Sequence, residues 1–153
     1  MAQEEQVTLL STLLSSYQVF ITYVPLRGEV DFTEPVALPK GTVAYTIPPR
    51  ASLDPKEEAN RIVGMVGKTS TVILIPGRRF DGSGTRHGQG GGWYDRFLSE
   101  VPREWLRIGF CFEDQLSPTP LKRESWDQAM DYVVVLNRGN AVTAVYSSEG
   151  TYD

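Results

Sequence analysis

The stretch TVILIPGRRFDGSGTRHGQGGGWYDRFL, residues 71–98, joins an apolar run, a glycine-rich segment and an amphipathic segment. The run TVILI at 71–75 is uninterrupted and mostly β-branched, which is typical of a strand in the middle of a parallel sheet. Seven of the fourteen glycines of the chain follow, between Gly77 and Gly92. An apolar stripe then predicts a helix that Pro102 ends; its members are Tyr94, Phe97, Leu98 and Val101.

Strands and helices are predicted to alternate on both sides of this stretch. Runs of β-branched and aromatic residues predict strands at 19–24, 42–47, 106–112, 131–136 and 141–146. Apolar spacing at Leu10, Leu13, Leu14 and Tyr17 predicts a helix over 5–17. A second helix is predicted over 54–66, with Asp54 as its N-cap, Pro55 in its first turn and Glu57 capping back. This order predicts an α/β fold: a single three-layer domain over residues 1–153, with a central, mostly parallel (mixed) sheet and helices on both faces.

Composition excludes several classes of protein. A net charge of −4 gives no general basic surface for nucleic acid, and no apolar run reaches the length of a membrane span. The acidic start MAQEEQ is unlike a signal peptide. A single cysteine, Cys111, excludes an internal disulfide and a cysteine zinc cluster. We therefore expect a cytoplasmic protein that binds neither nucleic acid nor membrane, as a monomer or weak homo-oligomer.

A strand, a glycine-rich loop and a helix in this order are typical of phosphate binding. Glycines let backbone N–H groups converge on one point, and the helix N-terminus adds partial positive charge. Arg78, Arg79 and Arg86 add full charges, and Asp95 in the first helical turn could hold a magnesium ion. The alternative is a merely flexible loop whose acid balances the helix dipole. The segment has no G-K-[ST] sequence and is too long for a dinucleotide-binding fingerprint, so neither of these familiar phosphate loops fits.

The segment resembles the signature of the 5-formyltetrahydrofolate cyclo-ligase family, P-G-x-x-F-D-x-x-G-x-R-L-G-x-G-x-G-Y-Y-D-x-x-L. His87 stands in place of a usual leucine, and Trp93 in place of a usual tyrosine. Downstream, IGFCFEDQL at 108–116 is similar to a second family motif, and upstream ITYVPLRGEVD at 21–31 is similar to the family's folate-contacting turn. Pro120, Asp127 and Asp131 are similar to the family's later proline and paired aspartates. Twelve signature positions match: Pro76, Gly77, Phe80, Asp81, Gly84, Arg86, Gly88, Gly90, Gly92, Tyr94, Asp95 and Leu98.

The resemblance implies an enzyme that binds ATP, Mg²⁺ and a reduced folate. In the implied reaction, the formyl oxygen of 5-formyltetrahydrofolate is phosphorylated, a folate nitrogen closes the ring, phosphate leaves, and 5,10-methenyltetrahydrofolate forms. Arg86 and Tyr94 are the implied catalytic residues, and Asp95 and Asp131 the implied magnesium ligands. The implied ATP-binding residues are Arg86, His87, Gly88, Gln89, Gly90, Gly91, Gly92, Trp93 and Tyr94. The implied substrate-binding residues are Val24, Glu29, Gln89, Gly90, Gly91, Gly92 and Trp93.

Each single residue also has a structural interpretation. Glu29 could be a solvated loop acid and His87 a solvated loop residue. Trp93 could pack rather than stack on a ligand ring. Asp131 could cap a strand edge; it precedes a strand, so it reaches the Asp95 site only if that strand runs antiparallel to 71–75 or if the loop 122–131 folds back.

Two departures from the family pattern keep a second function open. The predicted first helix contains no lysine or arginine, where the family has both, and the segment 48–70 is shortened. Arg50 could supply some of the missing charge. The alternatives are a divergent, non-catalytic nucleotide- or folate-binding relative with a regulatory role, and a kinase-like activity on another small heterocycle.

Overall fold

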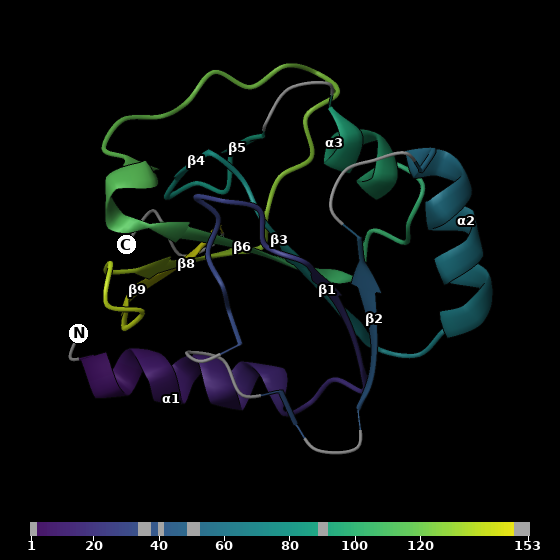
Figure 1. Cartoon of the computed structure of the whole chain (residues 1–153), viewed down its shortest axis with the longest axis horizontal. Coiled ribbons are helices and arrows are strands. Elements are labelled where there is room, and N and C mark those ends of the chain that lie inside the picture. The colour runs from purple at the N-terminus through teal and green to yellow at the C-terminus, as the bar shows by residue number, and fades with distance from the viewer. Residues whose placement is uncertain (1–2, 34–37, 40–41, 49–52, 89–91, 149–153) are drawn as a thin grey trace.

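A six-stranded sheet forms the middle of the molecule (Figure 1). The computed structural model describes residues 3–33, 38–39, 42–48, 53–88 and 92–148. The strands lie in the order β2-β1-β3-β6-β8-β9; all neighbours are parallel except β9, which is antiparallel to β8. Their bounds are Val19–Tyr23 (β1), Val43–Ile47 (β2), Thr71–Ile75 (β3), Leu106–Phe112 (β6), Tyr132–Leu136 (β8) and Val142–Ser147 (β9).

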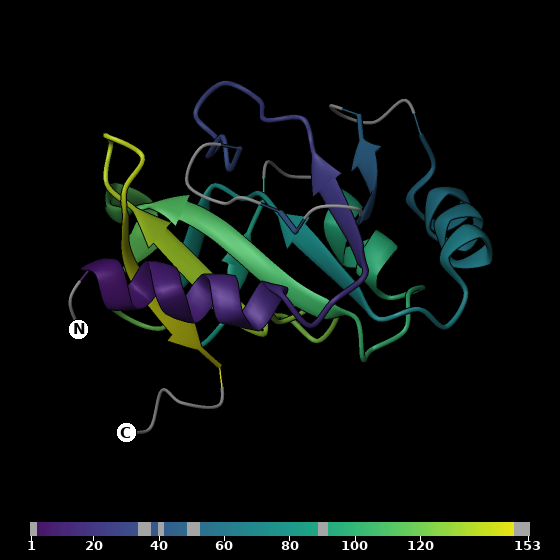
Figure 2. The same cartoon turned by 90° about the horizontal axis from the view of Figure 1, so that it is seen from below.

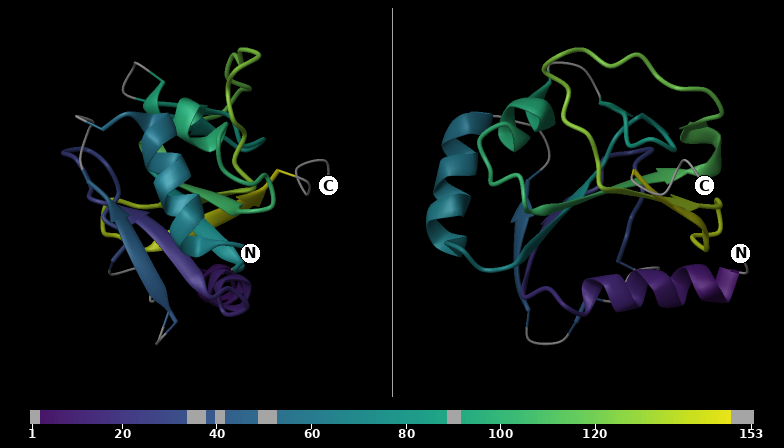
Figure 3. Two further views of the ribbon diagram at one scale, coloured as in Figure 1. Left: turned by 90° about the vertical axis from the view of Figure 1, so that its right-hand side faces the viewer. Right: turned by 180° about the vertical axis from the view of Figure 1, so that it is seen from behind.

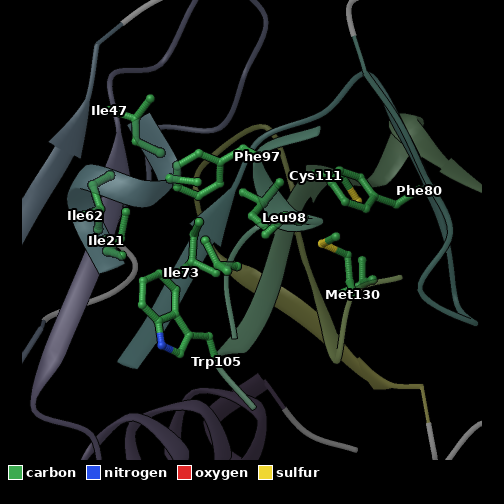
Figure 4. Close-up of a cluster of buried hydrophobic side chains, with 14 of the residues drawn as sticks. Ile21, Ile47, Ile62, Ile73, Phe80, Phe97, Leu98, Trp105, Cys111 and Met130 are labelled. Atoms are coloured by element: carbon green, nitrogen blue, oxygen red, sulfur yellow. The ribbon is translucent and has the colours of Figure 1, made fainter. Parts of the chain in front are cut away.

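Helices cover both faces of this sheet, which confirms the predicted three-layer α/β arrangement. Helix α1 (Gln3–Leu14) runs along one face, as Figure 2 shows. Helices α2 (Pro55–Val66) and α3 (Trp93–Leu98) lie side by side on the other face (Figure 3). Alternate residues of the central strands feed two separate cores, because successive strand side chains point to opposite faces. The core under α2 and α3, shown in Figure 4, includes Ile73, Phe80, Phe97 and Cys111.

The start of α2 follows the predicted capping. Asp54 has an extended backbone, and its carboxylate accepts a hydrogen bond from the Glu57 N–H at 2.9 Å. The other helices end earlier than predicted: α1 at Leu14, and α3 at Leu98 rather than near Pro102. No helix within the described ranges is long and apolar enough to cross a membrane.

A second, three-stranded sheet joins two strands from the predicted glycine-rich loop to a third strand that follows β6. Its strands, β4 (Arg79–Asp81), β5 (Arg86–His87) and β7 (Leu116–Ser117), have the order β5-β4-β7. A short 3-10 helix, Glu113–Gln115, precedes β7. Within the predicted glycine-rich loop, residues 79–87 therefore form an antiparallel hairpin, which the sequence analysis does not predict.

The side chain of Asp81 and the backbone of Gly84 shape this hairpin. The Asp81 carboxylate accepts hydrogen bonds from the N–H groups of Ser83 and Thr85, both at 3.0 Å. Gly84 has φ of +96°, and a Cβ there would lie 2.5 Å from the Met130 carbonyl oxygen. Only glycine fits this position, so part of the glycine content serves packing rather than ligand binding.

Candidate functional site

Strands β1 and β3 are adjacent and parallel, and the chain continues from their ends toward opposite faces of the sheet. After β1 it places Val30 and Phe32 in the core beside α1. After β3 it places Phe80 and Phe97 in the core beneath α2 and α3. In α/β sheets, ligands usually bind beyond the carboxyl ends of strands at such a divergence. Val24 and Glu29 follow β1 at this edge, and the glycine-rich segment follows β3 there.

Arg86 is the charged centre of this edge. Arg86 is only 7% exposed, and its Nε donates a hydrogen bond to the Pro76 carbonyl oxygen at 2.6 Å. Its guanidinium carbon lies 5.0 Å from the centroid of the Tyr94 ring. Burial lowers the pKa of Arg86, although the nearby Asp95 carboxylate opposes this shift. No carboxylate of the described residues forms an ion pair with it.

Gly88 lets the backbone approach this guanidinium. A Cβ at Gly88 would lie 2.8 Å from one terminal nitrogen of Arg86, so any other residue would displace the charged group. Gly92 has φ of +64° and directly precedes α3, so it sets the direction of the helix N-terminus. The other predicted loop residues, Gln89, Gly90 and Gly91, lie outside the described residues. The chain therefore holds a buried cation under a close backbone approach, an arrangement suited to an anion.

Tyr94 packs on the cation, and Trp93 packs against Tyr94 and Phe97. Burial raises the pKa of Tyr94, so its hydroxyl stays protonated at neutral pH. The Trp93 ring stacks on Phe97, with centroids 5.3 Å apart and planes inclined by 13°. Trp93 Nε1 also donates to the Leu53 carbonyl oxygen at 2.9 Å, which ties the segment before α2 to α3. These contacts favour the packing interpretation of Trp93.

The Asp95 carboxylate faces a loop that precedes β8. Its Oδ1 accepts a hydrogen bond from the Gln128 N–H at 3.0 Å. Burial raises the pKa of Asp95, and the neighbouring Asp127 carboxylate raises it further, while the Gln128 hydrogen bond and Arg86 lower it. Asp127 also acts electrostatically on Arg86. Arg86, Asp95 and Asp127 therefore belong to one charged site.

Asp131 lies in a different place. Strand β8 runs parallel to β6, so Asp131, directly before it, sits at the amino-terminal edge of the sheet. Its Oδ2 accepts from the Arg107 N–H at 2.9 Å, and its Oδ1 from Arg103 at 3.2 Å. These contacts anchor the start of β8. The pairing of Asp131 with Asp95 stays a prediction, whereas Asp127 is a second carboxylate that the sequence motif contains but that was not predicted as a ligand.

Residues 121–128, here called the covering segment, connect the small sheet to β8 and arch over the hairpin (Figure 1). His87 Nε2 donates to the Lys122 carbonyl oxygen at 2.8 Å. Arg123 donates to the Thr85 hydroxyl at 2.7 Å. The Leu121 N–H donates to Asp81 at 2.7 Å. His87 is half-buried and helps to hold this segment, and its contact with ATP stays a prediction.

Val24 and Glu29 follow β1 at the same sheet edge. Val24 is 42% exposed. Glu29 Oε1 accepts from the Leu26 N–H at 2.8 Å, which closes a tight turn. Gln115, from the downstream motif, donates to the Gly28 carbonyl oxygen at 3.1 Å and accepts from the Phe112 N–H at 2.9 Å. The motif glutamine therefore fixes the turn after β1 against the end of β6.

The model of the 5-formyltetrahydrofolate cyclo-ligase family matches residues 4–136. The chain belongs to this family. A 5-formyltetrahydrofolate cyclo-ligase of Saccharomyces cerevisiae is 37% identical over 70 residues, which cover 41% of this chain and 32% of the yeast protein. The match thus spans about a third of the length of that relative. A solved structure, the 5,10-methenyltetrahydrofolate synthetase from Mycoplasma pneumoniae, has a TM-score of 0.54 at 21% identity, covering 87% of this chain and 82% of that one. This structural likeness supports the α/β fold described above for this chain.

Proposed function

We propose that this chain catalyses the ATP- and magnesium-dependent conversion of 5-formyltetrahydrofolate to 5,10-methenyltetrahydrofolate. The proposal rests on its membership of the family and, above all, on one observation. Arg86 is buried at the carboxyl edge of the sheet, beside a glycine segment, with no ion-pair partner among the described carboxylates. Buried charges are normally paired, so the missing partner is an anion that the protein binds. The phosphates of ATP supply that anion.

In this proposal the chain contributes mainly position and charge. Arg86 neutralises charge that develops on the transferred phosphoryl group, and a planar guanidinium suits phosphate oxygens. The Tyr94 ring and the Pro76 carbonyl oxygen fix the orientation of the guanidinium before ATP arrives. Preorganised charge of this kind costs no rearrangement during the reaction.

The donor set near Arg86 fits a magnesium ion. Magnesium prefers carboxylate oxygens, keeps several waters, and needs only one or two protein carboxylates besides phosphate oxygens. Asp95 and Asp127 are close enough for Asp127 to raise the pKa of Asp95, a repulsion that a cation would relieve. We propose that these two carboxylates hold the ion. A bound magnesium ion would neutralise phosphate charge. No cluster of three metal-ligating side chains occurs in the described part of the chain, which agrees with a site completed by ATP.

The folate is proposed to lie on the β1 side of Arg86. Val24 offers an exposed apolar surface to the pterin ring. Because Glu29 Oε1 is occupied by the Leu26 N–H, we assign Glu29 Oε2 as the acceptor for the pterin amino group. The formyl oxygen would then face the phosphates at Arg86. This placement also explains why Gln115 needs to fix the turn.

The test is a turnover assay on the purified chain. With ATP, Mg²⁺ and 5-formyltetrahydrofolate present, we expect methenyltetrahydrofolate to appear by its near-ultraviolet absorbance and ADP to accumulate in equal amount. Omission of ATP or Mg²⁺ should abolish both products. If both substrates bind and neither product forms, the chain is a binding protein and the proposal is wrong.

A further inference from the structure

Trp126 is the feature of the covering segment that the proposed function does not yet use. It is 64% exposed, whereas Trp105 is buried and Trp93 is half-buried and hydrogen-bonded. Tryptophan is usually well buried, because removing its large apolar ring from water stabilises the fold. A single exposed apolar ring is common on protein surfaces. Whether Trp126 binds a ligand therefore depends on how rigidly its backbone is held and on what lies beside it.

The turn that carries Trp126 is closed on both sides. The Glu124 N–H donates to Asp127 Oδ2 at 2.8 Å, and the Asp127 N–H donates to the Glu124 carbonyl oxygen at 3.1 Å. Before the turn, Arg123 and Lys122 are bonded to the β5 region through Thr85 and His87. After it, Gln128 is bonded to Asp95 of α3. The backbone under the ring is therefore fixed relative to the hairpin and to α3.

The backbone that carries Trp126 lies beside the charged site, because Gln128, two residues further on, donates its N–H to Asp95 at 3.0 Å. Trp126 directly precedes Asp127, whose carboxylate acts electrostatically on both Arg86 and Asp95. The covering segment bonds to the glycine hairpin and α3, whereas the folate-side residues follow β1 and are fixed by Gln115. An exposed ring on a turn beside Asp95 can meet the base of a nucleotide whose phosphates lie at Arg86.

Resting on the proposed function, we infer that Trp126 stacks on the adenine of ATP. Stacking suits a flat ring held on a rigid turn, because little conformational entropy is lost when the base binds. Removal of an aromatic side chain from a stacked base typically weakens binding by about 5- to 100-fold. The turn would thus join two tasks, since Asp127 is proposed to hold the metal ion and the preceding residue to contact the base.

Two ligands separate base stacking from phosphate binding: MgATP, and magnesium tripolyphosphate, which has the phosphates but no base. Both are titrated calorimetrically against wild type, Trp126→Ala, Trp126→Phe and Leu9→Ala. Leu9 is an exposed apolar residue of α1, on the far side of the sheet, and serves as the matched control. Trp126→Ala should lose about 5- to 100-fold in affinity for MgATP and none for tripolyphosphate. Trp126→Phe should stay within about threefold of wild type, and Leu9→Ala should match it.

Three outcomes overturn the inference. Equal loss for both ligands would mean that Trp126→Ala disturbs the phosphate site, and no loss would mean that the base lies elsewhere. Loss of affinity for 5-formyltetrahydrofolate alone would assign the ring to the pterin. If wild type binds MgATP and Trp126→Ala gives either of the first two results, only this inference fails. If wild type binds neither phosphate ligand, the proposed function fails and this inference with it.

Discussion

Replacing Arg86 by methionine separates binding from folding more sharply than any other change in the site. Methionine keeps most of the apolar stem, which packs near Gly77, but removes the charge and the donors. In the ligand-free protein the variant loses the hydrogen bond to Pro76 and the contact with the Tyr94 ring, worth about 1 kcal/mol each. Relief of an unpaired buried charge offsets a similar amount. We expect the free energy of unfolding without ligand to stay within about 1 kcal/mol of wild type.

The effect on ATP should be large. Hydrogen bonds to a charged group contribute about 1.5–3 kcal/mol, so Kd for MgATP should rise by about 12- to 150-fold. The assay is thermal or denaturant unfolding with and without MgATP. At about 100 times the wild-type Kd, ATP stabilises wild type by about 2.7 kcal/mol and should stabilise the variant by only about 0.3–1.3 kcal/mol. Arg103→Met, an exposed arginine beside Asp131 at the amino-terminal edge of the sheet, is the control and should keep nearly the whole shift.

Two results would refute this reasoning. Wild-type affinity for MgATP in the Arg86→Met protein would show that the cation does not meet the phosphates. A variant that unfolds without ligand under native conditions would show that Arg86 is a structural residue whose partner lies within the chain.

Three further predictions follow from the structure. Asp95→Asn and Asp127→Asn should each abolish the magnesium-dependent part of ATP binding while Asp131→Asn preserves it. If titrations with and without Mg²⁺ show the loss for Asp95→Asn and Asp131→Asn but not for Asp127→Asn, the Asp95–Asp131 pair is restored. Because the pKa of Asp95 is raised, this carboxylate gains its proton on acidification earlier than an ordinary aspartate, so magnesium-dependent binding should fall first while the ligand-free protein gains stability. Asp95→Asn should remove that pH dependence and raise Tm at neutral pH; an unchanged profile of unfolding against pH would contradict the assignment. Gly109→Ala would place a Cβ 2.2 Å from the buried Phe80 ring and should destabilise the fold by about 1–3 kcal/mol or more, measured by urea unfolding, and a neutral effect would mean that the ring can move.

The main sheet could be predicted from the sequence because its strands carry strong local signals. The runs at 71–75 and 106–112 were assigned with the bounds that the structure shows, since buried parallel strands are apolar without interruption. The small sheet could not be predicted in the same way. Strands β5 and β7 have two residues each, too few for a period to appear, and β4 pairs with a segment over thirty residues away.

The site shows the same division between local and distant information. Arg86 and Asp95 were found from their place beside glycines and at a helix start. That Arg86 is buried depends on Tyr94 and Pro76 meeting around it, which no spacing rule reveals. The role of Asp127 depends on the covering segment, whose path is set by long-range hydrogen bonds to the hairpin. The pair of aspartates in the motif is visible in the sequence, but our proposal of Asp127 rather than Asp131 uses the direction of β8.

The most direct test of the account is a single stoichiometric measurement on the intact chain. ATP, Mg²⁺ and 5-formyltetrahydrofolate are mixed, and ADP and methenyltetrahydrofolate are quantified in parallel for wild type and Arg86→Met. The account predicts one ADP for each methenyltetrahydrofolate from wild type, and a loss of both products in the variant. ADP without methenyltetrahydrofolate, or neither product from a wild-type protein that binds both substrates, would contradict it.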